Sequence, residues 1–271
     1  MSEAPSPACE NRELLANITV SDELFRLDFS WDPCRPPKAG QFFMLKPLRS
    51  GVLLPRAISL AAWQPERGIV SFLIAQRGEG TRELADLRPG EKARLIGPLG
   101  NAWADFLAEG SPAQLGRIAL VGGGVGAAPL LALLRESGGK GFDFYAGFRS
   151  GAWTKAGREA FFLGALDKCE SAAFSSEDGS FGRAGRITDF VNPGAYAAVF
   201  ACGPEAMMRA VYKKCAAASV TCIVSMESRM ACGVGACKGC SIRVRAQGAE
   251  RSLSCCAEGP IFDAREGVLD G

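Results

Sequence analysis

The stretch Arg117–Ser137, RIALVGGGVGAAPLLALLRES, joins a short aliphatic run, a glycine turn and a second apolar run of helical length. The first run predicts a buried strand, and Pro129 is suited to the first turn of a helix. A strand, a tight turn and a helix in this order are typical of a parallel sheet covered by helices. The stretch therefore predicts an α/β domain in the middle of the chain.

The same alternation of strands and helices continues toward the C-terminus. FDFYAGF (142–148), AAVFAC (197–202) and VTCIVSM (220–226) are predicted strands. The amphipathic run EAMMRAVYKKCAAA (205–218) is a predicted helix between the last two. These elements extend the predicted parallel sheet.

The N-terminal third has a different pattern. ITVSDELFRLDFSW (18–31) alternates apolar and polar residues, which is the period of half-buried strands. GQFFML (40–45), RAISLAAW (56–63), GIVSFLIA (68–75) and KARLIG (92–97) continue the series between turn formers. Several short strands at this spacing predict a small antiparallel barrel.

The length of 271 residues allows two domains and a small third one. We expect a β-barrel over residues 1–108, an α/β domain over 109–222 and a small cysteine-rich domain over 223–271. The last segment is too short for a large core and is expected to need a staple such as a metal site.

Composition excludes some classes of function. A formal net charge of +2 gives no strong basic field for nucleic acid. The apolar runs are too short to cross a bilayer, and the first residues lack the apolar core of a signal peptide. We therefore expect a soluble, cytoplasmic chain, whose eleven cysteines are reduced rather than paired in disulfides.

The segment RMACGVGACKGC (229–240) places three cysteines in nine residues of a chain without histidine. The spacing Cys232-x4-Cys237-x2-Cys240 is that of plant-type [2Fe–2S] ferredoxins, which take a fourth cysteine from further along the chain. The intervening glycines permit a tight wrap in which backbone N–H groups point at the sulfurs. A structural zinc site is the alternative. SLSCCAEGP (252–260) offers two neighbouring cysteines for the fourth ligand, and in an extended segment only one of them would face the cluster.

Two features of the predicted barrel suggest a bound dinucleotide. In LLPRAISL (53–60), the guanidinium of Arg56 suits a pyrophosphate, although a surface arginine is the alternative. In GEGT (78–81), backbone N–H groups and a hydroxyl at a helix start form an anion site, although a simple threonine cap is the alternative. Together they favour a dinucleotide such as FAD.

Two turns at strand ends suggest a second nucleotide site. The turn Gly122–Gly126 follows a strand and opens a helix, but it lacks the third glycine and the acidic partner of a full Rossmann fingerprint. Cys202-Gly203-Pro204 ends a later strand at the sheet edge where ligands bind in open α/β folds. The alternatives are a tight strand–helix turn and a buried thiol.

Taken in order, these motifs resemble the ferredoxin–NADP reductase superfamily, and more closely the electron-transfer subunit of type B dihydroorotate dehydrogenase. The similar segments run through nearly the whole chain: LLPRAISL, GEGTREL, GPLGNAW, VGGGVGAAPL, EDGSFG, ACGPEAMM, MESRMACGVGACKGC and CAEGPIF. Their order is more specific than any single motif.

The resemblance implies an FAD-binding antiparallel barrel, a parallel α/β domain that binds NAD and a small [2Fe–2S] domain. It also implies an FMN-containing catalytic subunit that oxidises dihydroorotate in pyrimidine biosynthesis, in a heterotetramer of two plus two. In that family electrons reach NAD⁺ through the cluster and FAD, and no acid–base side chain of this chain is required.

The resemblance also implies binding residues. Flavin and pyrophosphate contacts would come from Arg56, Ala57, Ile58, Ser59, Leu73, Ile74, Ala75, Gly80 and Thr81. The nicotinamide nucleotide would contact Gly122, Gly123, Gly124, Gly126, Cys202, Gly203 and Pro204. Iron ligands would be Cys232, Cys237, Cys240 and Cys256, the last with two residues between it and the Gly-Pro turn.

Two other functions remain open at this stage. One is the NAD(P)H-handling flavin and iron–sulfur subunit of a ferredoxin-dependent transhydrogenase, sulfide dehydrogenase or cytosolic hydrogenase. The other is a non-redox nucleotide-binding scaffold with structural zinc.

Overall fold

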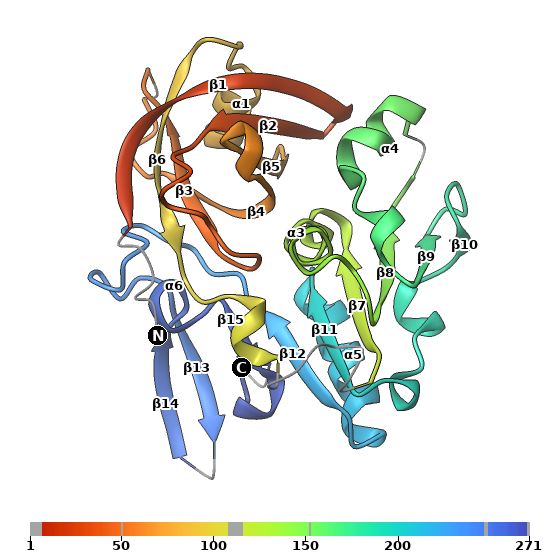
Figure 1. The fold of residues 1–271 in the computed structure, drawn as a ribbon. Coiled ribbons are helices and arrows are strands. Elements are labelled where there is room, and N and C mark those ends of the chain that lie inside the picture. Colours follow the sequence, from red (N-terminus) through yellow and green to blue (C-terminus); the bar gives the residue numbers. More distant parts are fainter. Residues whose placement is uncertain (1–6, 50, 108–115, 152, 247–248, 270–271) are drawn as a thin grey trace.

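Six antiparallel strands close into an N-terminal barrel in the order β1-β2-β5-β4-β3-β6 (Figure 1). The computed structural model describes residues 7–49, 51–107, 116–151, 153–246 and 249–269. The barrel elements are β1 (Ala8–Ser21), β2 (Leu24–Ser30), β3 (Phe42–Pro47), β4 (Arg56–Gln64), β5 (Ile69–Ala75), α1 (Glu79–Ala85) and β6 (Lys92–Leu99). The predicted antiparallel barrel is confirmed.

Aromatic side chains fill the barrel because inward-facing positions of its strands carry them. The ring of Phe43 lies edge-on to Trp31 at 4.9 Å and to Phe72 at 5.3 Å between centroids. Such edge-to-face pairs add about 0.5–1.5 kcal/mol each beyond the burial of their area. The barrel thus has a core of its own.

A seven-stranded sheet follows, in the order β10-β9-β8-β7-β11-β12-β15. Its strands are β7 (Ile118–Gly123), β8 (Phe142–Phe148), β9 (Ser171–Ser176), β10 (Arg183–Ala184), β11 (Ala198–Cys202), β12 (Thr221–Ser225) and β15 (Ile261–Asp263). The first six are parallel, and β15 is antiparallel to β12. The prediction of a parallel sheet is confirmed for β7, β8, β11 and β12, whereas β9 and β10 were not predicted. From β7 the chain builds outward through β8 and β9, and then returns to add β11 on the other side of β7. The strand order therefore reverses between β7 and β11, which is where open α/β sheets bind ligands.

Helices α3 (Ala128–Ser137) and α5 (Glu205–Ala217) pack against this sheet. Helix α4 (Lys155–Phe162) packs against β1 of the barrel. Every residue of α3 from Ala128 to Leu134 is buried, because the helix lies between the sheet and the barrel (Figure 1). That position explains why its sequence is apolar almost all round.

The segment after β6 ties the parts of the chain together. The Asn101 side chain donates to the carbonyl of Ile261 at 2.8 Å and accepts from the Ile261 N–H at 3.0 Å. Trp103 stacks on Phe200 of β11 and donates its indole N–H to the Pro129 carbonyl at 3.2 Å. The barrel is thereby fixed to both the sheet and the C-terminal segment.

The C-terminal part contains the hairpin β13 (Ser241–Ala246) and β14 (Ala249–Ser254) and the short helix α6 (Cys255–Glu258). The expected division at 222/223 falls within β12, and β15 returns to the sheet after the cysteine-rich segment. The division at 108/109 lies outside the described residues. Among the described helices, none is both long and apolar enough to cross a membrane.

Candidate functional site

The barrel brings Arg56 and Gly80 together from separate elements. A Cβ added at Gly80 would lie 2.6 Å from the Arg56 Nε, so only glycine lets the guanidinium lie on the start of α1. The Arg56 Nη1 donates to the Leu54 carbonyl at 2.8 Å. Thr81 is more enclosed: its Oγ1 accepts from the N–H groups of Arg77 at 2.9 Å and Gly78 at 3.1 Å. The threonine hydroxyl therefore holds the turn, while the guanidinium lies over it.

Two barrel strands carry the other residues expected near a flavin. Positions 56–59 at the start of β4 are all half-buried, whereas the next three residues of the strand are buried. On β5, Leu73 and Ile74 are buried in the core and Ala75 is half-buried. The side chains of Leu73 and Ile74 thus belong to the core, and their backbone is what a ligand could meet.

At the carboxyl edge of the sheet, the two predicted turns interlock. Cys202 of β11 pairs with Gly122 of β7. A Cβ added at Gly126 would lie 2.6 Å from the Gly203 Cα, and one at Gly123 would lie 2.7 Å from the Pro204 Cδ. The glycines therefore let backbone contact backbone at the point where the strand order reverses, and the predicted residues of both turns form one edge. Gly124 lies open on the outer side of the turn, with no atom within 4 Å of a Cβ built there.

Cys202 is a buried, neutral thiol. Burial raises the pKa of this thiol to about 12, because the thiolate would lose its solvation, and the carboxylate of Glu227 adds to the shift. A neutral thiol at the strand end is small and unreactive. It suits contact with a flat ring better than nucleophilic chemistry.

Glu227 is a candidate site residue that the sequence patterns did not single out. It follows β12 at the same sheet edge, in the SMES segment. Desolvation raises the pKa of its carboxyl group, and the charge of Arg77 opposes that rise. Its position directly after a buried parallel strand was the available signal, since such strand ends carry ligand contacts.

In the cysteine loop, backbone N–H groups point at the predicted ligand sulfurs. The Gly235 N–H donates to the Cys256 Sγ at 3.1 Å, and the Cys237 N–H donates to the Cys232 Sγ at 3.5 Å. The Cys256 N–H donates to the Cys240 Sγ at 3.4 Å. The N–H groups of Cys237 and Val234 lower the pKa of the Cys232 thiol to about 6. The loop therefore favours the thiolate at Cys232, which is the form that binds iron, whereas burial and the Cys240 thiol raise the pKa of Cys256 to about 11.

Cys255 and Cys256 point in different directions. The Cys256 Sγ lies 3.2 Å from the Cys240 Sγ, whereas the Cys255 Sγ points to the Met226 carbonyl at 3.5 Å. The expectation that both lie in an extended segment is wrong, because they begin the short helix α6. The structure thus brings Cys256 to the loop and directs Cys255 into the core. Within the described residues, no three Cys, His, Asp or Glu side chains gather as they would around a single metal ion.

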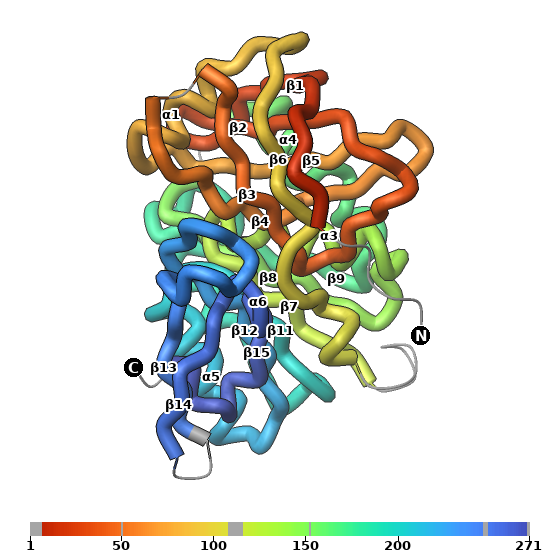
Figure 2. Tube along the Cα trace, turned by 90° about the vertical axis from the view of Figure 1, so that its left-hand side faces the viewer, coloured from red at the N-terminus to blue at the C-terminus, as the bar shows by residue number. Residues whose placement is uncertain are grey.

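The cysteine loop lies against the barrel. A Cβ added at Gly233 would be 2.8 Å from the Met44 Cγ and 3.0 Å from the Leu99 Cδ1. Met44 is on β3, where it pairs with Ala57 of β4. Figure 2 shows this loop, in blue, directly below β3. Only one strand therefore separates the loop from the strand expected to hold a flavin.

Comparison with known proteins agrees with this arrangement. Residues 227–267 match the iron–sulfur cluster binding domain of dihydroorotate dehydrogenase B. The electron transfer subunit of dihydroorotate dehydrogenase B (NAD(+)) from Clostridium acetobutylicum is 35% identical over 94% of this chain and 95% of its own length. The corresponding subunit from Caldanaerobacter subterraneus subsp. tengcongensis is 32% identical over 93% and 96%. This chain belongs to the family of dihydroorotate dehydrogenase B electron transfer subunits.

Solved structures of low identity share the fold. A chain of an NADH-dependent reduced ferredoxin-NADP oxidoreductase superposes with a TM-score of 0.76 at 24% identity, over 100% of this chain and 92% of its own. A ferredoxin NADP+ reductase from Neisseria gonorrhoeae, with bound FAD and NADP, gives 0.60 at 15% identity, over 77% and 91%. The predicted resemblance of this chain to dihydroorotate dehydrogenase B electron transfer subunits is confirmed. The prediction of an iron–sulfur site in preference to zinc is also confirmed, because residues 227–267 match an iron–sulfur cluster binding domain.

Proposed function

We propose that this chain passes electrons from an FMN-containing, dihydroorotate-oxidising catalytic subunit to NAD⁺, through a [2Fe–2S] cluster and FAD. The observation that carries the proposal is the contact of the Gly233 backbone with Met44, which places the cysteine loop one strand from Arg56–Ser59. FAD exchanges electrons singly or in pairs, so it connects a one-electron cluster with a hydride acceptor.

The residues of the chain divide the binding tasks. The flavin and its pyrophosphate are assigned to Arg56–Ser59, Leu73–Ala75, Gly80 and Thr81. The nicotinamide nucleotide is assigned to Gly122–Gly124, Gly126 and Cys202–Pro204. The cluster is assigned to Cys232, Cys237, Cys240 and Cys256. Hydride transfer to NAD⁺ would move no separate proton, but reduction of the flavin by two single electrons from the cluster would take up one proton, which solvent can supply. No side chain of this chain is assigned as an acid or base.

The wider setting belongs to the same proposal. The relatives are named electron transfer subunits, and such a subunit needs a catalytic partner. We assign the chain to a cytoplasmic heterotetramer of two catalytic and two electron transfer subunits. Its parts are a flavin barrel (1–108), a nucleotide domain (109–222) and a cluster domain (223–271).

Anaerobic purification tests the cofactors, and assays with and without the partner test the activity. We expect about one FAD and about two irons per chain. The isolated chain should transfer electrons from NADH to a dye, and should oxidise dihydroorotate only with the catalytic subunit. Stoichiometric zinc with no iron, or dihydroorotate turnover by the pure chain, would overturn the proposal.

The second candidate is the NAD(P)H-handling flavin and iron–sulfur subunit of a ferredoxin-dependent transhydrogenase, sulfide dehydrogenase or cytosolic hydrogenase. The superposition with the ferredoxin-NADP oxidoreductase chain over the full length of this chain favours it as the runner-up. Because the partner decides the substrate, purification from the native host separates the two. A co-purifying protein that lacks dihydroorotate oxidation would support the second candidate.

A further inference from the structure

A small apolar groove opens on the barrel beside the cysteine loop. It holds about 170 Å³ between β3, β6 and the loop that joins β3 to β4. Its lining residues are Met44, Lys46, Leu53, Pro55, Arg94 and Ile96. Small-molecule sites are larger, at roughly 300–1,000 Å³, so the groove suits a single side chain rather than a cofactor.

Exposed apolar side chains lie on the loop that joins β3 to β4 and on the cysteine loop. Leu53 is 83% exposed, and Leu48 and Leu54 on the same loop are 47% and 45% exposed. Val234 of the cysteine loop is 52% exposed. Covering such side chains is favourable by about 25 cal/mol per Å² of apolar surface, so this face is suited to a protein partner.

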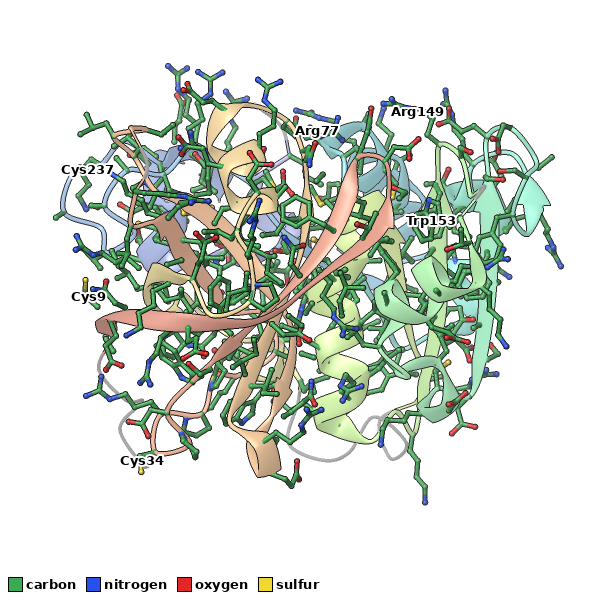
Figure 3. The ribbon with its side chains drawn as sticks, turned by 90° about the horizontal axis from the view of Figure 1, so that it is seen from above. Cys9, Cys34, Arg77, Arg149, Trp153 and Cys237 are labelled. Atoms are coloured by element: carbon green, nitrogen blue, oxygen red, sulfur yellow. The ribbon has the colours of Figure 1, made fainter. Side chains whose placement is uncertain are left out.

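The groove is continuous with the cysteine loop. Met44 lines the groove and also lies under the Gly233 backbone. Cys237, one of the proposed iron ligands, is exposed and lies at the periphery of the molecule in Figure 3. A partner that covers the groove would therefore also approach the cluster ligand, as one-electron transfer between the two proteins requires.

The charges on the groove indicate the chemistry of that partner. Lys46 donates to the Leu53 carbonyl at 3.1 Å, and Arg94 is exposed at the groove wall. The ion pairs found among the described residues include neither of these cations. Two cations beside an apolar groove are complementary to an apolar side chain flanked by carboxylates.

We infer that this groove receives an apolar side chain flanked by carboxylates from the catalytic subunit, and that Leu53 and Arg94 determine the specificity of docking. This inference rests on the proposed function. It adds a barrel surface to the interface that the cluster domain needs for electron transfer.

Calorimetric titration of the cofactor-loaded chain with the catalytic subunit tests the inference. Leu53→Asp places a carboxylate where one is expected from the partner, and should raise Kd at least tenfold. Arg94→Glu should raise Kd by a similar factor, and should weaken the salt dependence of binding. Leu15→Asp is the matched control, because Leu15 is 41% exposed on β1 and does not line the groove. It should change Kd less than twofold.

Iron content and NADH-to-dye activity show that each variant is folded and loaded, and both should equal the wild-type values. Equal Kd values for wild type, Leu53→Asp and Arg94→Glu would contradict the inference that the groove is a docking site, while leaving the proposed function intact. If the wild-type chain did not bind the catalytic subunit at all, both the proposed function and the inference that the groove is a docking site would be wrong. If Leu53→Asp changed only self-association of the chain, the occupant would be a second copy and the inference would be wrong.

Discussion

The turn Gly122–Gly126 at the sheet edge and the cysteine loop are both rich in glycine, but their glycines have different structural roles. At the sheet edge, Gly126 lets two backbone segments touch, since a Cβ there would lie 2.7 Å from the Cys202 carbonyl oxygen. In the cysteine loop, Gly233 and Gly235 have φ values of +74° and +77°. These left-handed residues turn N–H groups toward sulfur and leave much of the loop exposed.

The difference teaches which site is preformed. The sheet edge is shaped by the packing of the chain itself, so its geometry should persist without a ligand. The cysteine loop has exposed residues at positions 236–239 and few apolar contacts there, so its order should depend on the bonds to iron. Removal of a ligand should therefore affect the two regions very differently.

The largest expected effect is loss of the cluster on replacing Cys256. Cys256→Ser removes the thiol that lies beside Cys240, and iron should fall from about two per chain to near zero. Cys255→Ser should keep a normal [2Fe–2S] spectrum, because its thiol points to the Met226 carbonyl. Iron analysis and the paramagnetic signal of the reduced protein measure both. If Cys255→Ser lost the signal and Cys256→Ser kept it, the fourth ligand would be Cys255 and not Cys256.

The second effect concerns the sheet edge and should leave the cluster untouched. Gly126→Ala places a methyl group against backbone atoms that cannot move independently. Unfolding free energy should fall by about 1–3 kcal/mol, as in other overpacked sites. The KM for NADH should rise about tenfold, because the turn must open.

Gly124→Ala is the control for this substitution. Gly124 has φ +55° but open space around a Cβ, so alanine there costs only the left-handed strain of about 1–2 kcal/mol. Chemical denaturation compares the two variants, and KM is measured for Gly126→Ala alone, because Gly124 is itself assigned to the nicotinamide site. A stability loss in Gly126→Ala no larger than that in Gly124→Ala would show that backbone strain, and not the close contact, shapes the turn.

A third effect tests whether the sheet is held independently of the cluster. Asp143 is buried at the start of β8 and accepts hydrogen bonds from Ser171 and Tyr196 at 2.8 Å each, and from Arg117. Burial opposes ionisation, but these three donors outweigh it and lower the pKa of the Asp143 carboxyl group. The stabilisation is therefore present above the unfolded pKa of about 3.9, and is lost as pH falls through the lower folded pKa.

Asp143→Asn should accordingly destabilise the protein by about 1–2 kcal/mol at pH 7 and by progressively less below pH 4. Asp189→Asn, at an exposed position of the same sheet domain, should change stability by less than about 0.5 kcal/mol. Urea unfolding at several pH values measures this, with iron content as a second readout. Loss of iron in Asp143→Asn would contradict the independence of the two regions.

The sequence predicted those parts of the site that depend on local chain geometry. The glycine turn after Val121 and the spacing of Cys232, Cys237 and Cys240 each specify a short backbone path, and such paths are readable from consecutive residues. The barrel was predictable for the same reason, since the alternating pattern from Ile18 to Trp31 is local to one hairpin.

Features that depend on distant contacts could not be predicted in this way. The strand β15 joins the sheet only because Asn101 and β12 hold the segment after the Gly-Pro turn. The helix α6 is four residues long and carries too little periodicity to be recognised. Glu227 became a site residue only when the fold placed it near Cys202 and Arg77.

The smallest expected effect is a difference in thiol reactivity, and it compares one thiol from each region. With a pKa of about 12, Cys202 should be almost wholly protonated at pH 7.5, because burial disfavours its thiolate. Cys232 is only partly buried, in a loop whose order depends on iron, so once iron is removed it should react as an accessible thiol. Brief iodoacetamide treatment of the iron-free protein, followed by mass spectrometry of its peptides, should label Cys232 at least a hundredfold faster than Cys202. The exposed Cys34 serves as the reference for an accessible thiol. Equal labelling of Cys202 and Cys232 would mean that the sheet edge opens without ligand, and the contrast between a preformed site and an iron-dependent loop would not hold.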